Sequence, residues 1–216
     1  MSEDRPQIPA RIRLTGRALT AVIARAPWLW PLLRVPMRDF FDRSALGWDE
    51  RTGAGDAQHL MALAAAVPHV RPVPERILDL GTGTGVGALF LCREFPSARV
   101  RGVDISEEMI RAARDKIGLD PEGRIAFRVA DAGDLPYGED SFDLVVQVNM
   151  PAFFAEIARV LRPSGHVIVV ASLGPATPFY TPHAVLARGF RRRGIAEVAT
   201  SEARGGTYWV GRKEAI

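Results

Sequence analysis

The feature that most constrains this chain is a short apolar run, residues 77–80, that leads directly into four glycines at alternating positions. These are Gly81, Gly83, Gly85 and Gly87. Because glycine lacks a Cβ, the backbone there can adopt positive φ and its amides can approach a ligand closely. An apolar helix pattern follows over residues 88–95, and a helix start adds unpaired N–H groups and the positive end of its dipole. The junction predicts a site for a nucleotide-like ligand.

The spacing of the glycines separates the ligand classes that use such loops. A dinucleotide-binding turn needs Gly-x-Gly-x-x-Gly after the strand, and counted from Gly81 the third glycine position falls on Val86. A frame shifted by two residues meets the pattern only in its relaxed form, with alanine in third place, so a nicotinamide oxidoreductase remains an alternative. A P-loop ends in Gly-Lys-Ser/Thr, whereas the first lysine of this chain is Lys116, which excludes P-loop ATP hydrolysis.

Three aspartates follow successive strand patterns. Asp79 lies two residues before the first glycine, Asp104 ends the pattern 99–103, and Asp131 ends the pattern 125–130. In open α/β sheets the carboxyl ends of the strands bind ligands, so the three acids should share one edge of one sheet. A carboxylate at Asp79 repels a pyrophosphate but suits the ammonium and sulfonium of S-adenosylmethionine, Asp104 can accept both ribose hydroxyls, and Asp131 can accept a hydrogen bond from adenine N6.

Each of these acids also has a structural explanation. Asp104 could cap a helix that starts near Ser106, Asp131 could be an ordinary turn residue, and Asp79 could accept backbone N–H bonds from the glycine loop. The last explanation is compatible with ligand binding.

Taken in order, these motifs resemble those of the class I S-adenosylmethionine-dependent methyltransferase family. The matching segments are 79–85, 104–105, 131–132, 141–146 and 156–169, within a resemblance that covers residues 72–172. It implies an α/β fold with a Rossmann-like, doubly wound, seven-stranded sheet whose last strand is antiparallel. It further implies S-adenosyl-L-methionine as cofactor, bound by Asp79, Gly81, Thr82, Gly83, Gly85, Asp104, Ile105, Met109, Asp131, Ala132 and Asn149.

Composition bounds the remaining possibilities. With 216 residues, 47% of them hydrophobic, the chain can bury one good core. The single cysteine, Cys92, allows no intrachain disulfide, and four scattered histidines predict no metal site. A net charge of +3 gives no strong global field, so no nucleic-acid partner is expected. No signal-peptide pattern and no uninterrupted apolar run of about 18 residues are seen, so we expect a cytoplasmic protein.

The region before the first strand predicts a helical cap over residues 1–70, with residues 71–216 forming the cofactor-binding domain. An amphipathic helix is expected over 11–26, followed by the segment 27–36, in which three prolines should break the helix repeatedly. Seven arginines and no acid lie between residues 5 and 38. Such a basic, tryptophan-bearing segment suits either a lid over the cleft, which we favour, or peripheral contact with an anionic membrane.

Three further elements are expected outside the matched region. They are a helix over 56–67, a helix over 183–193, and a closing hairpin with strands at 195–201 and 207–212. In the resembled family, the stretch 41–49 closes over the methionine end of the cofactor, and Trp48 is the matching aromatic residue. An ordinary core position for Trp48 is the alternative.

The acceptor side departs from the family pattern. The segment after the fourth strand is shorter than expected and lacks the family's frequent histidine, so no catalytic base is assigned. Asn149-Met150-Pro151 is only faintly similar to the Asn-Pro-Pro motif of amino-group methyltransferases. Tyr137, Tyr180 and His183 are alternative bases.

The apolar cap favours a small-molecule or lipid-like methyl acceptor. Two alternatives remain. One is a non-catalytic S-adenosylmethionine-binding module, and the other is an RNA or protein methyltransferase that uses two arginine clusters, the one between residues 5 and 38 and a second at Arg188, Arg191, Arg192 and Arg193.

Overall fold

One seven-stranded sheet organises the part of the chain that the computed structural model describes, residues 9–118, 120, 122–203 and 205–215. The strands are β1 (Arg76–Leu80), β2 (Arg99–Asp104), β3 (Ile125–Val129), β4 (Phe142–Val148), β5 (Leu161–Ala171), β6 (Ile195–Ala203) and β7 (Gly206–Lys213). Their order is β3-β2-β1-β4-β5-β7-β6. Strands β1 to β5 are parallel, and β7 is antiparallel to both of its neighbours. The predicted doubly wound sheet with an antiparallel last strand is confirmed.

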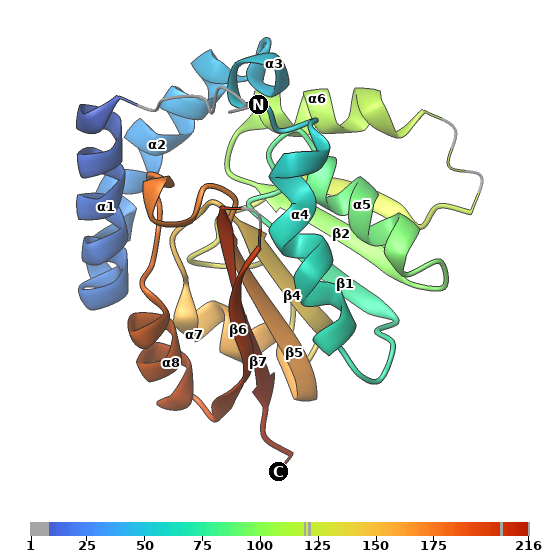
Figure 1. Cartoon of the computed structure of the whole chain (residues 1–216). Helices are drawn as coiled ribbons and strands as arrows, with labels where there is room; N and C mark the ends of the chain where they lie inside the picture. Colours follow the sequence, from blue (N-terminus) through green and yellow to red (C-terminus); the bar gives the residue numbers. More distant parts are fainter. Residues whose placement is uncertain (1–8, 119, 121, 204, 216) are drawn as a thin grey trace.

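Helices cover both faces of the sheet (Figure 1). They are α1 (Ala10–Arg25), α2 (Trp30–Ser44), α3 (Trp48–Thr52), α4 (Ala57–Ala66), α5 (Val86–Glu94), α6 (Glu107–Ile117), α7 (Phe154–Val160) and α8 (His183–Arg191), with short 3-10 turns η1 (Pro27–Leu29), η2 (Val67–His69) and η3 (Gly174–Ala176). Helices α4, α5 and α6 contribute to the core cluster on one face, and α7 and α8 to the cluster on the other. Two buried faces explain why the central strands read as nearly continuous apolar runs.

The site is positioned by a reversal of strand order. Strand β1 lies between β2 and β4, so the chain leaves β1 toward one side of the sheet and later returns on the other. At such a switch point the connections diverge and leave a crevice outside the carboxyl ends of the strands. Asp79 is the one polar residue in the buried part of β1, 2% exposed between the fully buried Leu78 and Leu80.

The cap takes a different path from the one that its prolines suggested. The expectation that residues 27–36 break the helix repeatedly was wrong, because α2 runs from Trp30 to Ser44 and contains both Pro31 and Pro36. Pro31 lies in the first turn, where its missing N–H had no helical partner in any case. Pro36 removes only one hydrogen bond from the helix interior. The boundary at residue 70 stays a prediction; α4, which falls before it, packs against β7.

Among the helices that the structure describes, none combines the length and the hydropathy needed to cross a bilayer. Within the same residues, no three His, Cys, Asp or Glu side chains are grouped so that they could hold a metal ion.

An aromatic stack closes the core beneath α8. Phe190 is fully buried, stacks on Trp209 with ring centroids 5.0 Å apart, and meets Phe154 edge-on at 4.8 Å. We expect Phe190→Ala to lower the free energy of unfolding by about 3–5 kcal/mol, since it leaves a cavity lined by rigid rings. Urea denaturation measures this, with Val198→Ala on the exposed side of β6 (47% exposed) as a control that should cost less than about 0.5 kcal/mol. Equal costs for the two variants would contradict the described packing.

Candidate functional site

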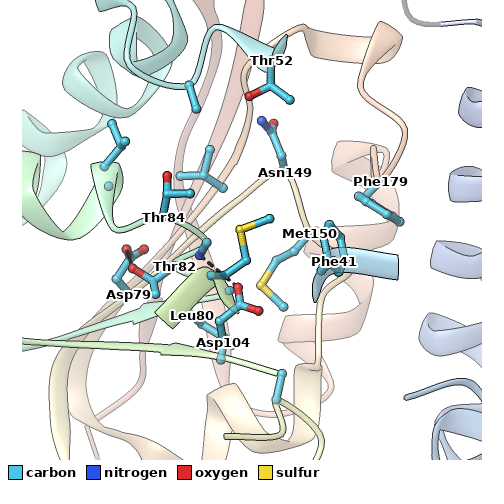
Figure 2. Close-up of a pocket in the computed structure, with 18 of the residues that line it drawn as sticks. Phe41, Thr52, Asp79, Leu80, Thr82, Thr84, Asp104, Asn149, Met150 and Phe179 are labelled. Atoms are coloured by element: carbon cyan, nitrogen blue, oxygen red, sulfur yellow. Dashed lines mark hydrogen bonds between the residues drawn. The ribbon is translucent and has the colours of Figure 1, made fainter. Parts of the chain in front are cut away.

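A cavity of about 290 Å³ opens at the carboxyl ends of β1, β2 and β4, between the glycine loop, the cap and the segment after β5. Figure 2 shows Asp79, Thr82 and Asp104 on one side of this cavity and Phe41 and Phe179 on the other. The predicted site residues that line it are Asp79, Gly81, Thr82, Gly83, Asp104, Ile105, Met109, Ala132 and Asn149. The volume suits a small-molecule ligand.

The glycines of the loop have different tasks. Gly81, Gly83 and Gly85 all have positive φ, at 68°, 53° and 84°. No atom lies within 4 Å of the position that a Cβ on Gly83 would take, whereas a Cβ on Gly85 would lie 2.7 Å from Phe127 Cζ. Gly83 therefore borders open space in the cavity, while Gly85, which is outside the cavity wall, allows α5 to start close against β3.

Asp79 is a buried carboxylate without a counter-charge. Thr82 Oγ1 donates to its Oδ2 at 2.6 Å, and within the described part of the chain no Lys or Arg forms an ion pair with it. Burial raises the pKa of Asp79 to about 6, and the nearby Asp104 adds to the rise. A buried charge is costly unless it is paired, so this position suits a cationic group of a ligand.

Asp104 connects the ends of two strands. Its Oδ2 accepts from Gly83 N and its Oδ1 from Ser106 N, both at 2.9 Å. Ser106 itself caps α6 by accepting from Met109 N at 3.1 Å. Burial raises the pKa of Asp104. Asp104 therefore helps to fix the start of α6, as its structural explanation predicted, although Ser106 is the capping residue. Asp104 also lines the cavity.

Asp131 is engaged by the cap. Trp30 Nε1 donates to its Oδ1 at 2.6 Å, and Arg34 Nη1 lies 3.2 Å from its Oδ2. Its neighbours Ala130 and Ala132 line the cavity, but Asp131 does not. In this arrangement the carboxylate ties α2 to the end of β3, and a role as acceptor for adenine N6 stays a prediction.

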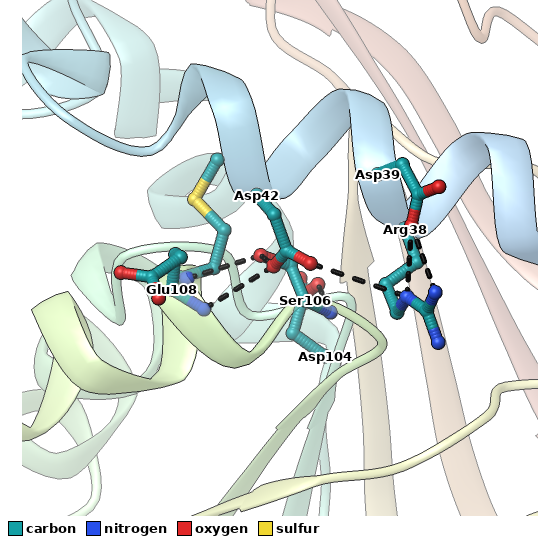
Figure 3. Close-up of polar contacts among 7 residues, drawn as sticks. Arg38, Asp39, Asp42, Asp104, Ser106 and Glu108 are labelled. Carbon is teal, nitrogen blue, oxygen red and sulfur yellow. Dashed lines mark hydrogen bonds and ion pairs between the residues drawn. The ribbon is translucent and has the colours of Figure 1, made fainter.

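Two further aspartates of the cap, Asp42 and Asp49, were not predicted as site residues. Asp42 Oδ1 on α2 accepts from Ser106 Oγ at 2.6 Å and from Glu108 N at 3.3 Å (Figure 3). Asp49 on α3 accepts from Thr84 Oγ1 at 2.5 Å and pairs with Lys116. These contacts fasten the cap to the glycine loop and to the start of α6, and no local pattern signals them.

The far side of the cavity is mostly apolar. Its wall includes Trp30, Met37, Phe41, Trp48, Met150, Phe153, Leu173 and Phe179. Asn149 also lines it, but its side-chain amide bonds Ser172 at both ends, Nδ2 to Ser172 Oγ and Oδ1 from Ser172 N, each at 2.8 Å. Such a wall suits an apolar ligand and excludes water.

None of the three alternative bases, Tyr137, Tyr180 and His183, lies in the cavity wall, whereas His59 does. Burial lowers the pKa of His59, against an opposing effect of Asp49 and Asp56. A neutral imidazole can accept a proton. No local pattern marks His59 as a site residue, because its neighbours in the cavity wall come from distant segments.

Comparison with known proteins bears directly on this geometry. Residues 77–165 match a family model described as a methyltransferase domain. A malonyl-[acyl-carrier protein] O-methyltransferase of Laribacter hongkongensis is 36% identical over 156 residues, which cover 65% of this chain and 51% of the relative. A ubiquinone/menaquinone biosynthesis C-methyltransferase of Geobacter sulfurreducens is 34% identical over 114 residues, 49% of this chain and 44% of the relative. These matches support a class I S-adenosylmethionine-dependent methyltransferase family for this chain.

Solved structures agree with this family. A chain from the complex between the Haloferax volcanii Trm112 methyltransferase activator and a methyltransferase superposes with a TM-score of 0.66 at 25% identity, over 81% of this chain and 97% of that one. An Aquifex aeolicus methyltransferase superposes with a TM-score of 0.62 at 16% identity, over 74% and 95% of the chains, and shows the shared fold alone. The chain spans about half the length, or less, of the two curated relatives above. The cofactor prediction, S-adenosylmethionine, is confirmed at the level of the family.

Stability should depend on pH through Asp79. Its folded pKa of about 6 lies above the ordinary value of 3.8, so the unfolded chain ionises first and the free energy of unfolding falls as pH rises from about 4 to about 6. The loss should approach about 3 kcal/mol. The unfolding free energies of wild type and Asp79→Asn are measured from pH 4 to pH 7. The wild type should lose stability relative to Asp79→Asn up to a pH of about 6, and above that pH the difference between the two should stay constant. A difference that does not change with pH would contradict the raised pKa.

Proposed function

We propose that this domain transfers the methyl group of S-adenosylmethionine to a small or lipid-like acceptor. The observation that carries the proposal is the buried Asp79 carboxylate, which lines the cavity without a cationic partner among the described residues. The family matches support the same assignment.

The residues present fit this cofactor. Asp79 would hold the ammonium group, the loop at Gly83 leaves room for the main chain to approach the ligand, and Asp104 would accept from the ribose. Ile105 and Ala132 would flank the adenine on the apolar side of the wall. The cofactor supplies an electrophilic methyl group on a sulfonium, and the protein's part is to align the acceptor and keep water out, which can provide most of the rate.

The acceptor would lie against the apolar wall. Met37 and Phe41 reach it from α2, Met150 and Phe153 from the segment after β4, and Phe179 from the segment after β5. The relatives are named for malonyl-[acyl-carrier protein] and for ubiquinone/menaquinone biosynthesis, two acceptors of different kinds, so we propose the class of acceptor from the wall itself. For a hydroxyl acceptor, His59 would take the proton.

Binding of S-adenosylhomocysteine tests the site without knowledge of the acceptor. Gly83→Ala should weaken binding at least tenfold in calorimetry, because its Cβ would occupy space beside the loop that the ligand needs. Gly118→Ala is the matched control: Gly118 also has positive φ (61°) and open surroundings, but it lies outside the cavity wall. Its affinity should equal that of the wild type. If both variants lost affinity for S-adenosylhomocysteine equally, or if the wild type did not bind it, the proposed cofactor site would be wrong.

The affinity for S-adenosylhomocysteine should also follow the charge of Asp79. Below a pH of about 6 the protonated acid no longer attracts the ammonium, so affinity should rise from pH 5 to pH 7 with release of a proton. In Asp79→Asn the affinity should be at least tenfold lower at pH 7 and should change little over this range. A wild-type affinity independent of pH would argue against an Asp79–ammonium contact.

A further inference from the structure

Helix α2 carries apolar side chains on two opposite sides. Trp30, Met37 and Phe41 line the cavity. At about 100° per residue, Leu32 and Val35 project from the opposite side, where they are 73% and 45% exposed. A surface helix ordinarily has its apolar residues on the side that faces the core and polar residues on the other side, so apolar residues on the outward side of α2 are unusual. The outward side of α2 therefore lacks a cover in the part of the chain that the structure describes.

Exposed apolar surface is concentrated in the cap. Of the ten large apolar side chains that are exposed among the described residues, seven belong to residues 12–46. They are Ile12, Leu14, Trp28, Leu32, Val35, Phe40 and Leu46. The other three are Val73, Val129 and Val198, in separate elements. Single exposed apolar residues are normal, whereas several exposed on the same part of a fold indicate an interaction surface.

Arginines predominate around this surface, and the one acid on the outward side of α2, Asp39, pairs with Arg38. Residues 9–38 contain six arginines and no acid. On α1, Arg11, Leu14 and Arg25 lie on the side opposite to the buried Gly16 and Ile23, and all three are exposed. Arg25 is only three residues from Trp28, which is 73% exposed at the corner between α1 and α2. We call Arg11, Leu14, Arg25, Trp28, Leu32 and Val35 the outer cap face.

We propose that the outer cap face docks the domain on an anionic lipid bilayer. A bilayer satisfies both parts of the face at once, because its interface takes the indole of Trp28 and the side chains of Leu32 and Val35, while its phosphates attract Arg11 and Arg25. A second copy of the chain is a poor occupant, since pairing of the same face would bring arginines against arginines. Docking would also place the α2 wall of the cavity beside the membrane.

Vesicle co-sedimentation of the full chain, without cofactor, tests this surface independently of the proposed function. Vesicles of equal parts phosphatidylglycerol and phosphatidylcholine should bind the protein, and pure phosphatidylcholine should bind it far less. The pair Trp28→Ser/Leu32→Ser should reduce partitioning at least tenfold. The pair Arg11→Gln/Arg25→Gln should reduce it roughly fivefold per arginine, with a weaker dependence on salt.

Matched controls come from exposed positions outside the cap. Val73→Ser/Val198→Ser removes similarly exposed apolar groups, and Arg93→Gln/Arg99→Gln removes exposed arginines; both should bind within twofold of the wild type. As a readout that needs no loss of binding, vesicles should shift the wild-type tryptophan emission to the blue, and Trp28→Phe should remove that shift.

Three results would overturn the proposal. The first is no binding to the anionic vesicles at low salt, and the second is equal loss in the cap and control pairs. The third is binding of a soluble polyanion or an acidic protein, but not of vesicles, which would assign the face to another class of partner. Thermal unfolding of each variant identifies any that misfold. If a variant misfolds, the blue shift of the wild-type tryptophan emission and its loss in Trp28→Phe decide whether the outer cap face meets the membrane.

Discussion

The arrangement depends on two carboxylates, the buried Asp79 and the half-buried Asp104, that lie at the ends of adjacent strands. Asp104 bonds Gly83 N and Ser106 N, so one side chain fixes both the glycine loop and the start of α6. Asp79 is held by Thr82 and receives no counter-charge within the described residues. Two acids raised in pKa by burial cost free energy in the fold. A site that keeps them side by side is organised for a ligand that brings positive charge and hydroxyl donors.

The cap is part of this site because acids fasten it at three separate points. Asp42 binds the first turn of α6 alongside Ser106, where the positive end of the helix dipole favours a carboxylate. Asp49 binds Thr84 of the glycine loop, and Asp131 receives Trp30 from α2. Each contact joins the cap to a loop that borders the cavity. Movement of the cap would therefore change the position of the loops as well as the apolar wall.

Local patterns predicted the parts of the fold in which neighbours in sequence decide the structure. The strand ending at Asp79, the glycine turn and the strand ending at Asp104 follow from periodicity and from the need for positive φ. The path of the cap could not be predicted in this way, because Pro36 is tolerated in a helix that packs over the cavity. The hydrogen-bond partners of Asp131, Trp30 and Arg34, could not be predicted either, because they lie about a hundred residues away in the sequence. Gly85 was assigned to ligand contact by its motif, yet the packing of Phe127 explains its lack of a Cβ.

The two apolar sides of α2 follow from one requirement. A wall that keeps water from a transferable methyl group must be apolar on its inner side, and a single helix is only about 10 Å thick with its side chains. When that helix is also the outermost layer, its other side meets solvent unless something covers it. Polar residues there would cost less free energy, but α2 has the exposed Leu32 and Val35 beside its Asp39, and the exposed Trp28 precedes it in η1. That choice makes sense when the cover is a surface that can also contain an apolar acceptor, because the distance from that surface to the cavity is then the thickness of one helix.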